Sequence, residues 1–503
     1  MWKLMYERML TRRSALTSHP HATGGIFLTR MNRTLSTIFA LSSGQGKCGV
    51  AVVRVSGSAA FEALAKMTTL RNPEPRRALL RKIYDPVTRD VIDKGLCLWF
   101  PAPNSFTGED SVEFQVHGGS AILHAIMSAL GKLKFRPAEP GEFTKRAFYN
   151  GKLDLTEIEG LADLIHAETE QQRKQALLQA DGSLSELYDS WRASLSKILA
   201  HVEAYIDFSE DDNIEDNVLA ICNQRIGELI VPISKHLADG RKGEILRTGV
   251  RTAIIGRPNV GKSSLMNYLV QRNAVIVTPI AGTTRDVVEL NANICGYPVI
   301  LADTAGLAES TQDVVELEGI KRARAYAKDA DLVILMVDAS SFVSSGLSLG
   351  EYVDNYVRGL EMEEIILGDG ELLRNCLVVV NKTDLIEEKV KGMLRSFEAV
   401  PISCAKEEGF EELMESLENK FQRICGNPSR ESPTISQARH RTHLINCLEY
   451  LELYLEISSR EEYDMVIAAQ QIRNAMRELG KITGHISTEE ILDIIFTSFC
   501  IGK

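Results

Sequence analysis

Residues 256–263 constrain this chain more than any other stretch. They read G-R-P-N-V-G-K-S and fit the pattern G-x-x-x-x-G-K-[ST], a loop whose backbone N–H groups wrap phosphate groups. An apolar run, 252–255, precedes the loop, and a helical pattern, 264–270, follows it, which is the strand–loop–helix setting that the motif requires. The stretch therefore predicts a nucleoside triphosphate site, in which Lys262 supplies a charge to the β- and γ-phosphates and Ser263 supplies an oxygen to Mg²⁺.

Four further motifs follow in order. G-T-T-R-D at 282–286 offers a threonine to the Mg²⁺ shell, and D-T-A-G at 303–306 offers an acid that faces the metal and an amide for the γ-phosphate. In N-K-T-D at 381–384, Asp384 can accept two N–H bonds from guanine, whereas adenine lacks both donors and would leave the carboxylate unpaired. S-C-A-K at 403–406 presents backbone N–H groups to the guanine oxygen. Together the motifs predict GTP with Mg²⁺.

The five motifs define a predicted nucleotide site. Contacts are expected from Asn259, Val260, Gly261, Lys262, Ser263, Ser264, Thr278, Thr283, Thr284, Asp303, Thr304, Ala305, Gly306, Asn381, Lys382, Asp384, Ser403, Cys404 and Ala405. Ser263 and Thr284 are the expected Mg²⁺ ligands.

The residue after D-T-A-G is Leu307, where small GTPases often carry a glutamine that orients the attacking water. Leucine cannot do this, so the sequence predicts that an acid or amide elsewhere takes the role, with 313–318 as the candidate tract.

The composition is that of an ordinary soluble globular protein. At 503 residues the chain is long enough for about three domains, and 44% hydrophobic with 25% charged residues is typical of packed cores with polar surfaces. A formal charge of −11 argues against non-specific coating of nucleic acid but permits a local basic surface. With no run of about 18 apolar residues, no membrane span is predicted. Nine scattered cysteines without a C-x-x-C pair predict a reducing compartment.

The first 33 residues differ from the rest. They are rich in Ser and Thr and contain one acid, Glu7, against the basic residues Lys3, Arg8, Arg12, Arg13, Arg30 and Arg33. This composition is typical of an organelle transit peptide, of which the mitochondrial kind is the commoner. A disordered basic tail is the alternative, and Met31 offers an internal start. Residues 1–33 are therefore excluded from the predicted fold.

Residues 34–152 predict an α+β domain, because short β-rich runs interleave with helical stretches. The expected strands are 37–41, 49–55, 95–100 and 111–116, and the expected helices are 58–67 and 120–133. In the last of these strands, Val112, Phe114 and Val116 alternate with polar residues, a pattern typical of a half-buried strand.

The remainder predicts one helical domain with an α/β unit inserted in it. Residues 153–247 and 425–503 carry helical apolar stripes, whereas 248–424 alternates apolar strands with helices, as parallel α/β sheets do. The expected strands are 250–255, 298–301, 331–337 and 376–380, with an insertion that carries its own helix at 340–375. Compact domains tolerate such insertions where chain ends lie close together. The fold class is therefore multidomain: an α+β N-terminal domain, an α-helical domain and an inserted α/β P-loop domain of the Ras-like type.

Four stretches point to a family. They are N-S-F-T-G-E-D at 104–110, R-P-A-E-P-G-E-F at 136–143, N-G-K-L-D-L at 150–155 and F-C-I-G-K at 499–503. Together with the nucleotide motifs, they resemble the tRNA-modification GTPase family MnmE (also called TrmE) in its mitochondrial form. The resemblance covers nearly all of residues 35–503.

The resemblance implies an architecture and a reaction. The family has an N-terminal folate-binding domain that forms a homodimer, and a helical domain interrupted by the GTPase domain. With an FAD-containing MnmG-type partner, its members modify C5 of the wobble uridine of certain tRNAs, and the carbon comes from 5,10-methylene- or 5-formyl-tetrahydrofolate. The product is a taurinomethyl group in animal mitochondria and an aminomethyl or carboxymethylaminomethyl group in bacteria. Location in the mitochondrial matrix follows as an expectation.

The resemblance also implies how hydrolysis proceeds without a glutamine after D-T-A-G. A K⁺ ion beside the phosphates replaces an arginine finger and offsets charge on the β–γ bridge. Asn259 and oxygens at Thr278, Ile280 and Thr283 would hold this ion. Glu316 would orient the attacking water, with Glu318 as the alternative because the spacing from Asp303 differs by one residue from the family pattern.

A folate site is implied in the N-terminal domain. Its expected ligands are Arg54, Glu113, Lys152 and Lys503, and Cys500 is either a catalytic thiol or a structural cysteine at a helix end. Residues 42–48 read S-S-G-Q-G-K-C and depart from the glycine- and arginine-containing loop of the family, which leaves the pterin contacts there open.

Two other classes of protein remain as alternatives. A ribosome-assembly or other RNA-linked switch GTPase would need neither the C-I-G-K end nor the folate-like N-terminal domain. A stand-alone folate aminomethyltransferase would leave the GTPase motifs unexplained.

Overall fold

The computed structural model describes most of the chain after its first 35 residues. The described residues are 36–44, 46–208, 218–272, 289–302, 324–367, 375–460, 464–486, 492, 495–497, 499 and 502. Contacts between Cα atoms divide the chain into two compact units. Unit 1 comprises Met1–Ala162, Ala180–Ser185 and Gly480–Lys503, and unit 2 comprises Asp163–Gln179 and Glu186–Leu479. The domain boundaries expected from the sequence stay predictions.

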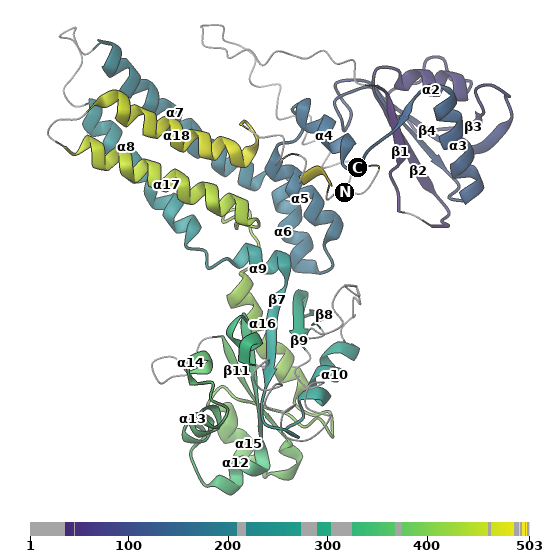
Figure 1. Cartoon of the computed structure of the whole chain (residues 1–503). Coiled ribbons are helices and arrows are strands. Elements are labelled where there is room, and N and C mark those ends of the chain that lie inside the picture. The colour runs from purple at the N-terminus through teal and green to yellow at the C-terminus, as the bar shows by residue number, and fades with distance from the viewer. Residues whose placement is uncertain are drawn as a thin grey trace. The chain divides into compact units, whose positions relative to one another are not determined.

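A six-stranded sheet forms the centre of unit 1 (Figure 1). Its strands are β1 (Ile38–Leu41), β2 (Ala51–Ser56), β3 (Leu79–Tyr84), β4 (Val91–Phe100), β5 (Ser111–Val116) and β6 (Arg136–Pro137). Their order is β3-β4-β5-β2-β1-β6, and each pair is antiparallel except β1 with β6. The predicted strand 111–116 coincides with β5.

The alternation of side chains along β2 separates two faces of this sheet. Ala51, Val53 and Val55 are buried against helices α2 (Ala60–Met67) and α3 (Ser120–Lys132). Because successive side chains of a strand point to opposite faces, Arg54 lies on the other face. That second face is partly covered by helix α4 (Glu142–Tyr149), whose Phe143 packs in a small cluster with residues of β1. The charged residue of β2 is thereby placed on the α4 side of the sheet.

The C-terminal residues of the chain pack within unit 1. The ring of Phe496 lies 6.4 Å from that of Phe148 on α4. A Cβ atom added at Gly484 would come within 2.7 Å of Leu155, where α5 (Leu155–His166) begins. Residues more than three hundred positions apart are therefore neighbours in this unit.

A second six-stranded sheet lies in unit 2. Its strands are β7 (Val250–Ile255), β8 (Glu289–Ile294), β9 (Tyr297–Ala302), β10 (Leu332–Asp338), β11 (Cys376–Asn381) and β12 (Val400–Pro401). The order is β12-β11-β10-β7-β9-β8, with all pairs parallel except β8 with β9. All six residues of β11 are buried, as expected for a central parallel strand that is covered on both faces. The predicted strand 250–255 coincides with β7.

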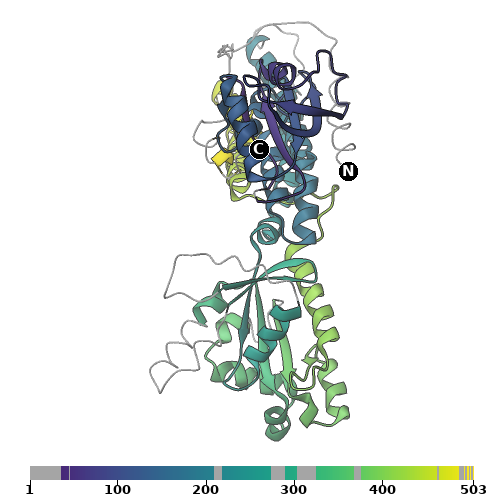
Figure 2. The ribbon, with the colours of Figure 1, turned by 90° about the vertical axis from the view of Figure 1, so that its right-hand side faces the viewer.

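Helices cover both faces of the second sheet (Figure 2). On one face, α10 (Lys262–Arg272) and α16 (Phe410–Cys425) pack their apolar residues against the strands. On the other face, α13 (Leu349–Gly359) is the main covering helix. With α12 (Ala339–Ser345) and α14 (Glu363–Ile366), it confirms the prediction of helix within 340–375.

The remaining helices of unit 2 come from both sides of the phosphate-loop motif in the sequence. They are α6 (Glu170–Ala180), α7 (Ser183–Phe208), α8 (Val218–Leu237), α9 (Lys242–Thr248), α15 (Glu388–Arg395), α17 (Ala438–Ser458) and α18 (Met465–Thr483). Of these, α7, α8, α17 and α18 lie side by side in Figure 1. Tyr188 of α7 contacts the rings of His236 on α8 and His440 on α17. The predicted helical domain with an inserted α/β unit is thus confirmed.

None of the helices in the described part of the chain combines the length and the apolarity that crossing a bilayer requires.

Candidate functional site

The phosphate loop follows β7, and its shape depends on two glycines. A Cβ atom at Gly256 would lie 2.5 Å from the Met336 carbonyl oxygen, and one at Gly261 would lie 2.2 Å from Nδ2 of Asn381. Gly261 has φ +105°, a conformation that favours glycine. Asn259 has φ +61°, a left-handed conformation that asparagine tolerates better than most residues. The motif glycines are therefore required by close packing.

Lys262 begins helix α10 at the end of this loop. Its Nζ atom donates to the carbonyl oxygens of Gly256 and Arg257, both at 2.9 Å. Burial lowers the pKa of Lys262, which means that the ammonium group is only partly hydrated. Ser263 and Ser264 are exposed in the first turn of the helix. A partly dehydrated cation, exposed hydroxyls and a helix N-terminus fit a phosphate chain with its metal ion.

Asn381 connects the phosphate loop to the predicted base-binding loop. Its Nδ2 atom donates to the Val260 carbonyl oxygen at 2.7 Å, and its Oδ1 atom accepts from the Cys404 N–H at 3.0 Å. The Cys404 N–H is therefore engaged within the protein. Ala405 makes no hydrogen bond within the described part of the chain, so its N–H is the better candidate for the guanine oxygen.

Asp384 is held as an ionised carboxylate. Ser403 Oγ donates to Asp384 Oδ1 at 2.6 Å, and this hydrogen bond is the main reason that the pKa of Asp384 is lowered. Lys382 has φ +63° and pairs through Nζ with Asp338 Oδ2 at 2.6 Å, at the end of β10. Thr383 Oγ1 donates to the Ile402 carbonyl oxygen at 2.8 Å. The residues around Asp384 thus fix the loop and leave a carboxylate suited to the two N–H groups of guanine.

Part of the predicted site lies outside the described residues. This holds for Thr278, Ile280, Thr283, Thr284, Asp303, Thr304, Ala305, Gly306, Glu316, Cys500 and Lys503. Their roles stay predictions. Within the described ranges, no group of three or more His, Cys, Asp and Glu residues is placed to hold a metal ion.

In unit 1 the predicted folate ligands Arg54 and Glu113 form an ion pair. They are directly opposite each other in the register of β2 with β5, and Arg54 Nε and Nη2 both lie 3.0 Å from Glu113 Oε1. The Arg54 guanidinium also lies over the rings of Phe106, at 5.2 Å, and Phe143, at 5.7 Å. Both charged side chains keep some exposure, 14% and 18%, so the pair is desolvated yet accessible.

Lys152 and the C-terminal tail lie close to this pair in the fold of unit 1. A Cβ atom at Gly108 would be 3.4 Å from Lys152 Cε, which places the lysine against the loop that carries Phe106. Ser42 Oγ donates to the Gly502 carbonyl oxygen at 2.9 Å. A Cβ atom at Gly502 would lie 2.0 Å from the Leu41 carbonyl oxygen, at the end of β1, and β1 pairs with the strand that carries Arg54. The structure thus places the residue before Lys503 beside the predicted folate site.

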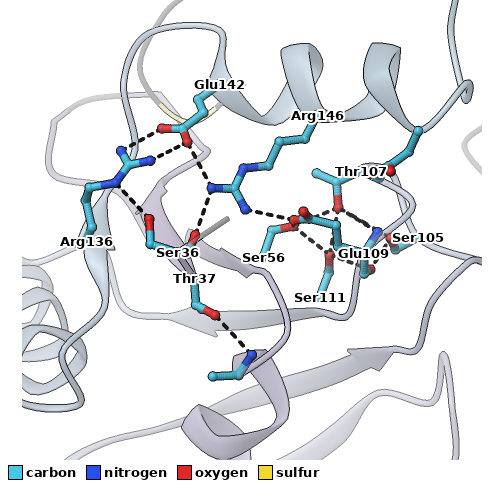
Figure 3. A network of polar contacts seen from close by, with 12 residues as sticks. Ser36, Thr37, Ser56, Ser105, Thr107, Glu109, Ser111, Arg136, Glu142 and Arg146 are labelled. Atoms are coloured by element: carbon cyan, nitrogen blue, oxygen red, sulfur yellow. Dashed lines mark hydrogen bonds and ion pairs between the residues drawn. The ribbon is translucent and has the colours of Figure 1, made fainter. Parts of the chain in front are cut away.

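A buried polar network holds the loop 104–110 against α4 (Figure 3). Arg146 is 2% exposed and donates to Glu109 Oε2 and Glu142 Oε1, both at 2.9 Å. Ser56 Oγ also donates to Glu109 Oε2, at 2.9 Å. Burial by itself raises the pKa of Glu142, but hydrogen bonds from Arg136, the Glu139 amide and Arg146 outweigh it, so that the net pKa is lowered. The ion pairs of Arg146 with Glu109 and Glu142 therefore hold the loop that carries Phe106 against α4.

Sequence reasoning missed several residues that build these sites. Ser42 lies in the loop 42–48, where the sequence left the pterin contacts open, but its contact with Gly502 carried no signal. Phe106 lies in a family stretch, but its contact with Arg54 depends on the fold. The polar run at 141–146 did carry a signal, since Glu142 and Arg146 are four positions apart and share one face of a helix.

Comparisons with known proteins agree with the geometry. Residues 155–500 match the family model described as the MnmE helical domain, and residues 37–152 match that of the GTP-binding protein TrmE N-terminus. The mitochondrial 5-taurinomethyluridine-[tRNA] synthase subunit GTPB3 of Danio rerio is 48% identical over 476 residues, and its human counterpart is 46% identical over 471 residues. Each alignment covers 93% of this chain and 93% of the relative. The tRNA modification GTPase MnmE of Rickettsia bellii is 45% identical over 471 residues, covering 93% of this chain and 100% of that protein.

Replacing Asp384 by Asn should change the preferred base. The amide would donate where guanine also donates, so affinity for GTP should fall by about five- to 150-fold, since an unpaired polar contact costs ~1–3 kcal/mol. Xanthosine triphosphate, which presents an oxygen at that position, should bind the variant better than it binds the original protein. Equilibrium binding of both nucleotides checks this, and unchanged GTP affinity would contradict the base-reading role.

Replacing Arg146 by Met should destabilise unit 1 by about 3–5 kcal/mol, because two carboxylates lose a buried partner. Hydrogen exchange in peptides from α4 should therefore be at least about a hundredfold faster. Arg77→Met is the control: Arg77 pairs with Glu74 in the same unit, the two side chains are 66% and 67% exposed, and the loss of this pair should cost less than about 1 kcal/mol.

The effect of Arg146→Met should depend on pH in a defined direction. Because the pKa of Glu142 is lowered by folding, the stabilisation is present above the ordinary pKa of Glu and is lost as pH falls through the lowered value. The difference between the two proteins should therefore shrink in acid. Equal exchange rates at neutral pH would show that Arg146 does not hold the loop.

Proposed function

The chain belongs to the MnmE (TrmE) family of tRNA-modification GTPases, and on that premise we propose that its GTP hydrolysis drives installation of a folate-derived group on tRNA. The group is added at C5 of the wobble uridine of mitochondrial tRNAs and is of the taurinomethyl or carboxymethylaminomethyl type. The relatives of this chain are named as mitochondrial taurinomethyluridine synthase subunits and as a bacterial tRNA modification GTPase.

One observation carries this proposal beyond a generic GTPase. Gly502 is seated at the end of β1, beside the strand that carries the Arg54–Glu113 pair. A switch protein for ribosome assembly has no need of a second site of this kind, far in sequence from its nucleotide motifs. The tail contact therefore favours modification chemistry over a pure switch.

In the nucleotide site, each described residue has a distinct task. Lys262 neutralises charge on the β- and γ-phosphates, and Ser263 gives one oxygen to Mg²⁺. Asp384 selects guanine with the Ala405 N–H. Asn259, exposed in the phosphate loop, is the proposed side-chain ligand of K⁺. A K⁺ ion held there would offset the negative charge that develops on the phosphates during hydrolysis, in the place of an arginine finger.

In the folate site, the proposed ligands complement a reduced pterin and its charged tail. The pterin presents N–H donors, which suit the Glu113 carboxylate, and a flat ring, which suits the aromatic side chain of Phe106. Arg54, Lys152 and Lys503 suit carboxylate groups. Bound 5,10-methylene- or 5-formyl-tetrahydrofolate supplies the one-carbon unit. Cys500 remains a candidate thiol for this transfer.

The proposed partners follow from the same assignment. They are tRNA, an FAD-containing MnmG-type protein and a second copy of this chain bound through the N-terminal domain. The chain is mitochondrial, as its named animal relatives are, and we place it in the matrix, where mitochondrial tRNAs are found.

Removing residues 500–503 should abolish modification of wobble uridine in mitochondrial tRNA. Nucleoside analysis of tRNA from cells that carry only the shortened chain checks this. GTP turnover should stay within about twofold, because the tail belongs to the other compact unit from the nucleotide loops. Loss of both activities would mean that the tail serves stability alone.

A point substitution tests the tail without shortening it. Gly502→Ala should reproduce the loss of modification, since the added Cβ atom would lie 2.0 Å from a backbone oxygen and the residue has φ +100°. Gly350→Ala is the matched control, because nothing lies within 4 Å of its added Cβ. Normal modification by Gly502→Ala would contradict the proposed role of the tail.

GTP hydrolysis should be faster in K⁺ than in Na⁺ at equal ionic strength and fixed Mg²⁺, by on the order of tenfold or more. The ion must contact several oxygens at once, which Na⁺ is too small to do in a site shaped for K⁺. Rb⁺, of similar size to K⁺, should restore the rate. Equal initial rates in K⁺ and Na⁺ would remove the potassium assignment.

A further inference from the structure

The N-terminus of helix α6 contacts two segments that lead into the nucleotide site. One is the turn of the β8–β9 hairpin, which joins residues 273–288 to residues 303–323 in the chain. These two stretches carry the motifs G-T-T-R-D and D-T-A-G. The other is α9, which runs through Gly249 directly into β7 and the phosphate loop. All three elements belong to unit 2.

The hairpin turn caps the helix. Cys295 and Gly296 form its two central residues, with φ +52° and +83°, as in the tight turns that suit β-hairpins. The Gly296 carbonyl oxygen accepts from the Gln171 N–H at 3.1 Å. This N–H belongs to the first turn of α6, where amides have no partner within the helix. The hairpin therefore completes the helix, and any displacement of the turn exposes that donor.

Gln172 uses both ends of its side-chain amide. Its Oε1 atom accepts from the Thr169 N–H at 3.2 Å, while the Gln172 N–H donates to Thr169 Oγ1 at 3.4 Å, so the two residues form a capping box. Its Nε2 atom donates to the Arg247 carbonyl oxygen at 3.0 Å, in the last turn of α9. One side chain thus joins the start of α6 to the end of α9.

Further contacts fix α9 along its length. Gln175 is 7% exposed and donates through Nε2 to the Gly243 carbonyl oxygen at 3.1 Å. Arg247 pairs with Asp163 at 2.8 Å, and Glu244 accepts from Arg441 of α17 at 2.8 Å. The short helix that precedes the phosphate-loop strand therefore has little freedom to move independently of α6 and α17.

We propose that the N-terminus of α6 positions the nucleotide-binding segments for GTP hydrolysis, with Gln172 as the positioning residue. It acts on the phosphate loop through α9 and β7, and on the motifs G-T-T-R-D and D-T-A-G through the hairpin turn that joins them in the chain. Through these contacts, a change in the nucleotide-binding segments and a change at the start of α6 would bias each other, because such coupling is reciprocal. The inference rests on the GTPase activity of the family.

Gln172→Glu tests the link without uncapping the helix. The carboxylate keeps an acceptor for the Thr169 N–H, and a negative charge is favourable at a helix N-terminus. The new side chain lacks the Nε2 donor of glutamine and places a carboxylate oxygen opposite the Arg247 carbonyl oxygen. We expect kcat for GTP hydrolysis to fall by on the order of tenfold, the scale of one lost hydrogen bond, while Kd for a non-hydrolysable GTP analogue stays within about twofold. Gln470→Glu, an exposed site on α18, makes the same charge change and should alter neither value.

A second pair of variants tests the hairpin contact. Gln171→Pro removes the N–H that reaches Gly296, and proline is tolerated in the first turn of a helix. Gln171→Ala keeps the N–H. We expect kcat to fall in the proline variant and to stay unchanged in the alanine variant.

The outcomes separate this inference from the assignment of activity. If the unaltered protein fails to hydrolyse GTP in the same assay, the assignment of activity itself is wrong. If it hydrolyses GTP but Gln172→Glu leaves kcat unchanged and only lowers the melting temperature, α6 is a structural support and the inference is overturned. A fall in GTP affinity with unchanged kcat, or an equal loss in Gln470→Glu, also overturns it.

Discussion

The nucleotide site depends on a single buried amide. Asn381 is 3% exposed and holds the Val260 carbonyl oxygen with one end and the Cys404 N–H with the other. These partners belong to the phosphate loop and to the base-binding loop, which are more than a hundred residues apart. Because a buried polar group without its partner costs ~1–3 kcal/mol, the amide fixes the distance between the two loops. The distance between the loop for the base and the loop for the phosphates is therefore set before any nucleotide binds.

Central strands could be predicted from the sequence, and edge strands could not. β7 and β5 coincide with their predicted ranges because each has neighbours on both sides and a clear apolar pattern. β3 and β8, which were not predicted, lie at the edges of their sheets. β3 reads L-L-R-K-I-Y and is mostly exposed or half-buried, and β8 reads E-L-N-A-N-I. β3 lacks a regular apolar alternation. β8 does alternate and buries Ala292 and Ile294, but it is short and contains two Asn residues, which have low strand propensity.

The site residues also divide into those that the sequence alone could identify and those that it could not. Motif spacing alone identified Lys262 and Asp384, because the phosphate and guanine chemistry restricts the residue types. Arg54 and Glu113 were implied only by resemblance, since a charged residue on a strand is usually solvated. Their pairing becomes visible once the register of β2 with β5 is known. Contacts between distant segments, such as Ser42 with Gly502, 460 positions apart, have no local signal at all.

If GTP hydrolysis is to affect the proposed folate chemistry, part of the chain must connect the nucleotide site with the folate site. The Arg54–Glu113 pair belongs to unit 1 and Asn381 to unit 2, while in the proposed function the carbon chemistry is carried by folate and FAD. Hydrolysis can influence that chemistry only if GTP and its products bind differently to two arrangements of the protein. An element that transmits the difference must contact the nucleotide segments and continue in the chain towards the other unit. Among the described elements α6 meets both conditions, since it bonds to the hairpin turn and to α9 and follows α5.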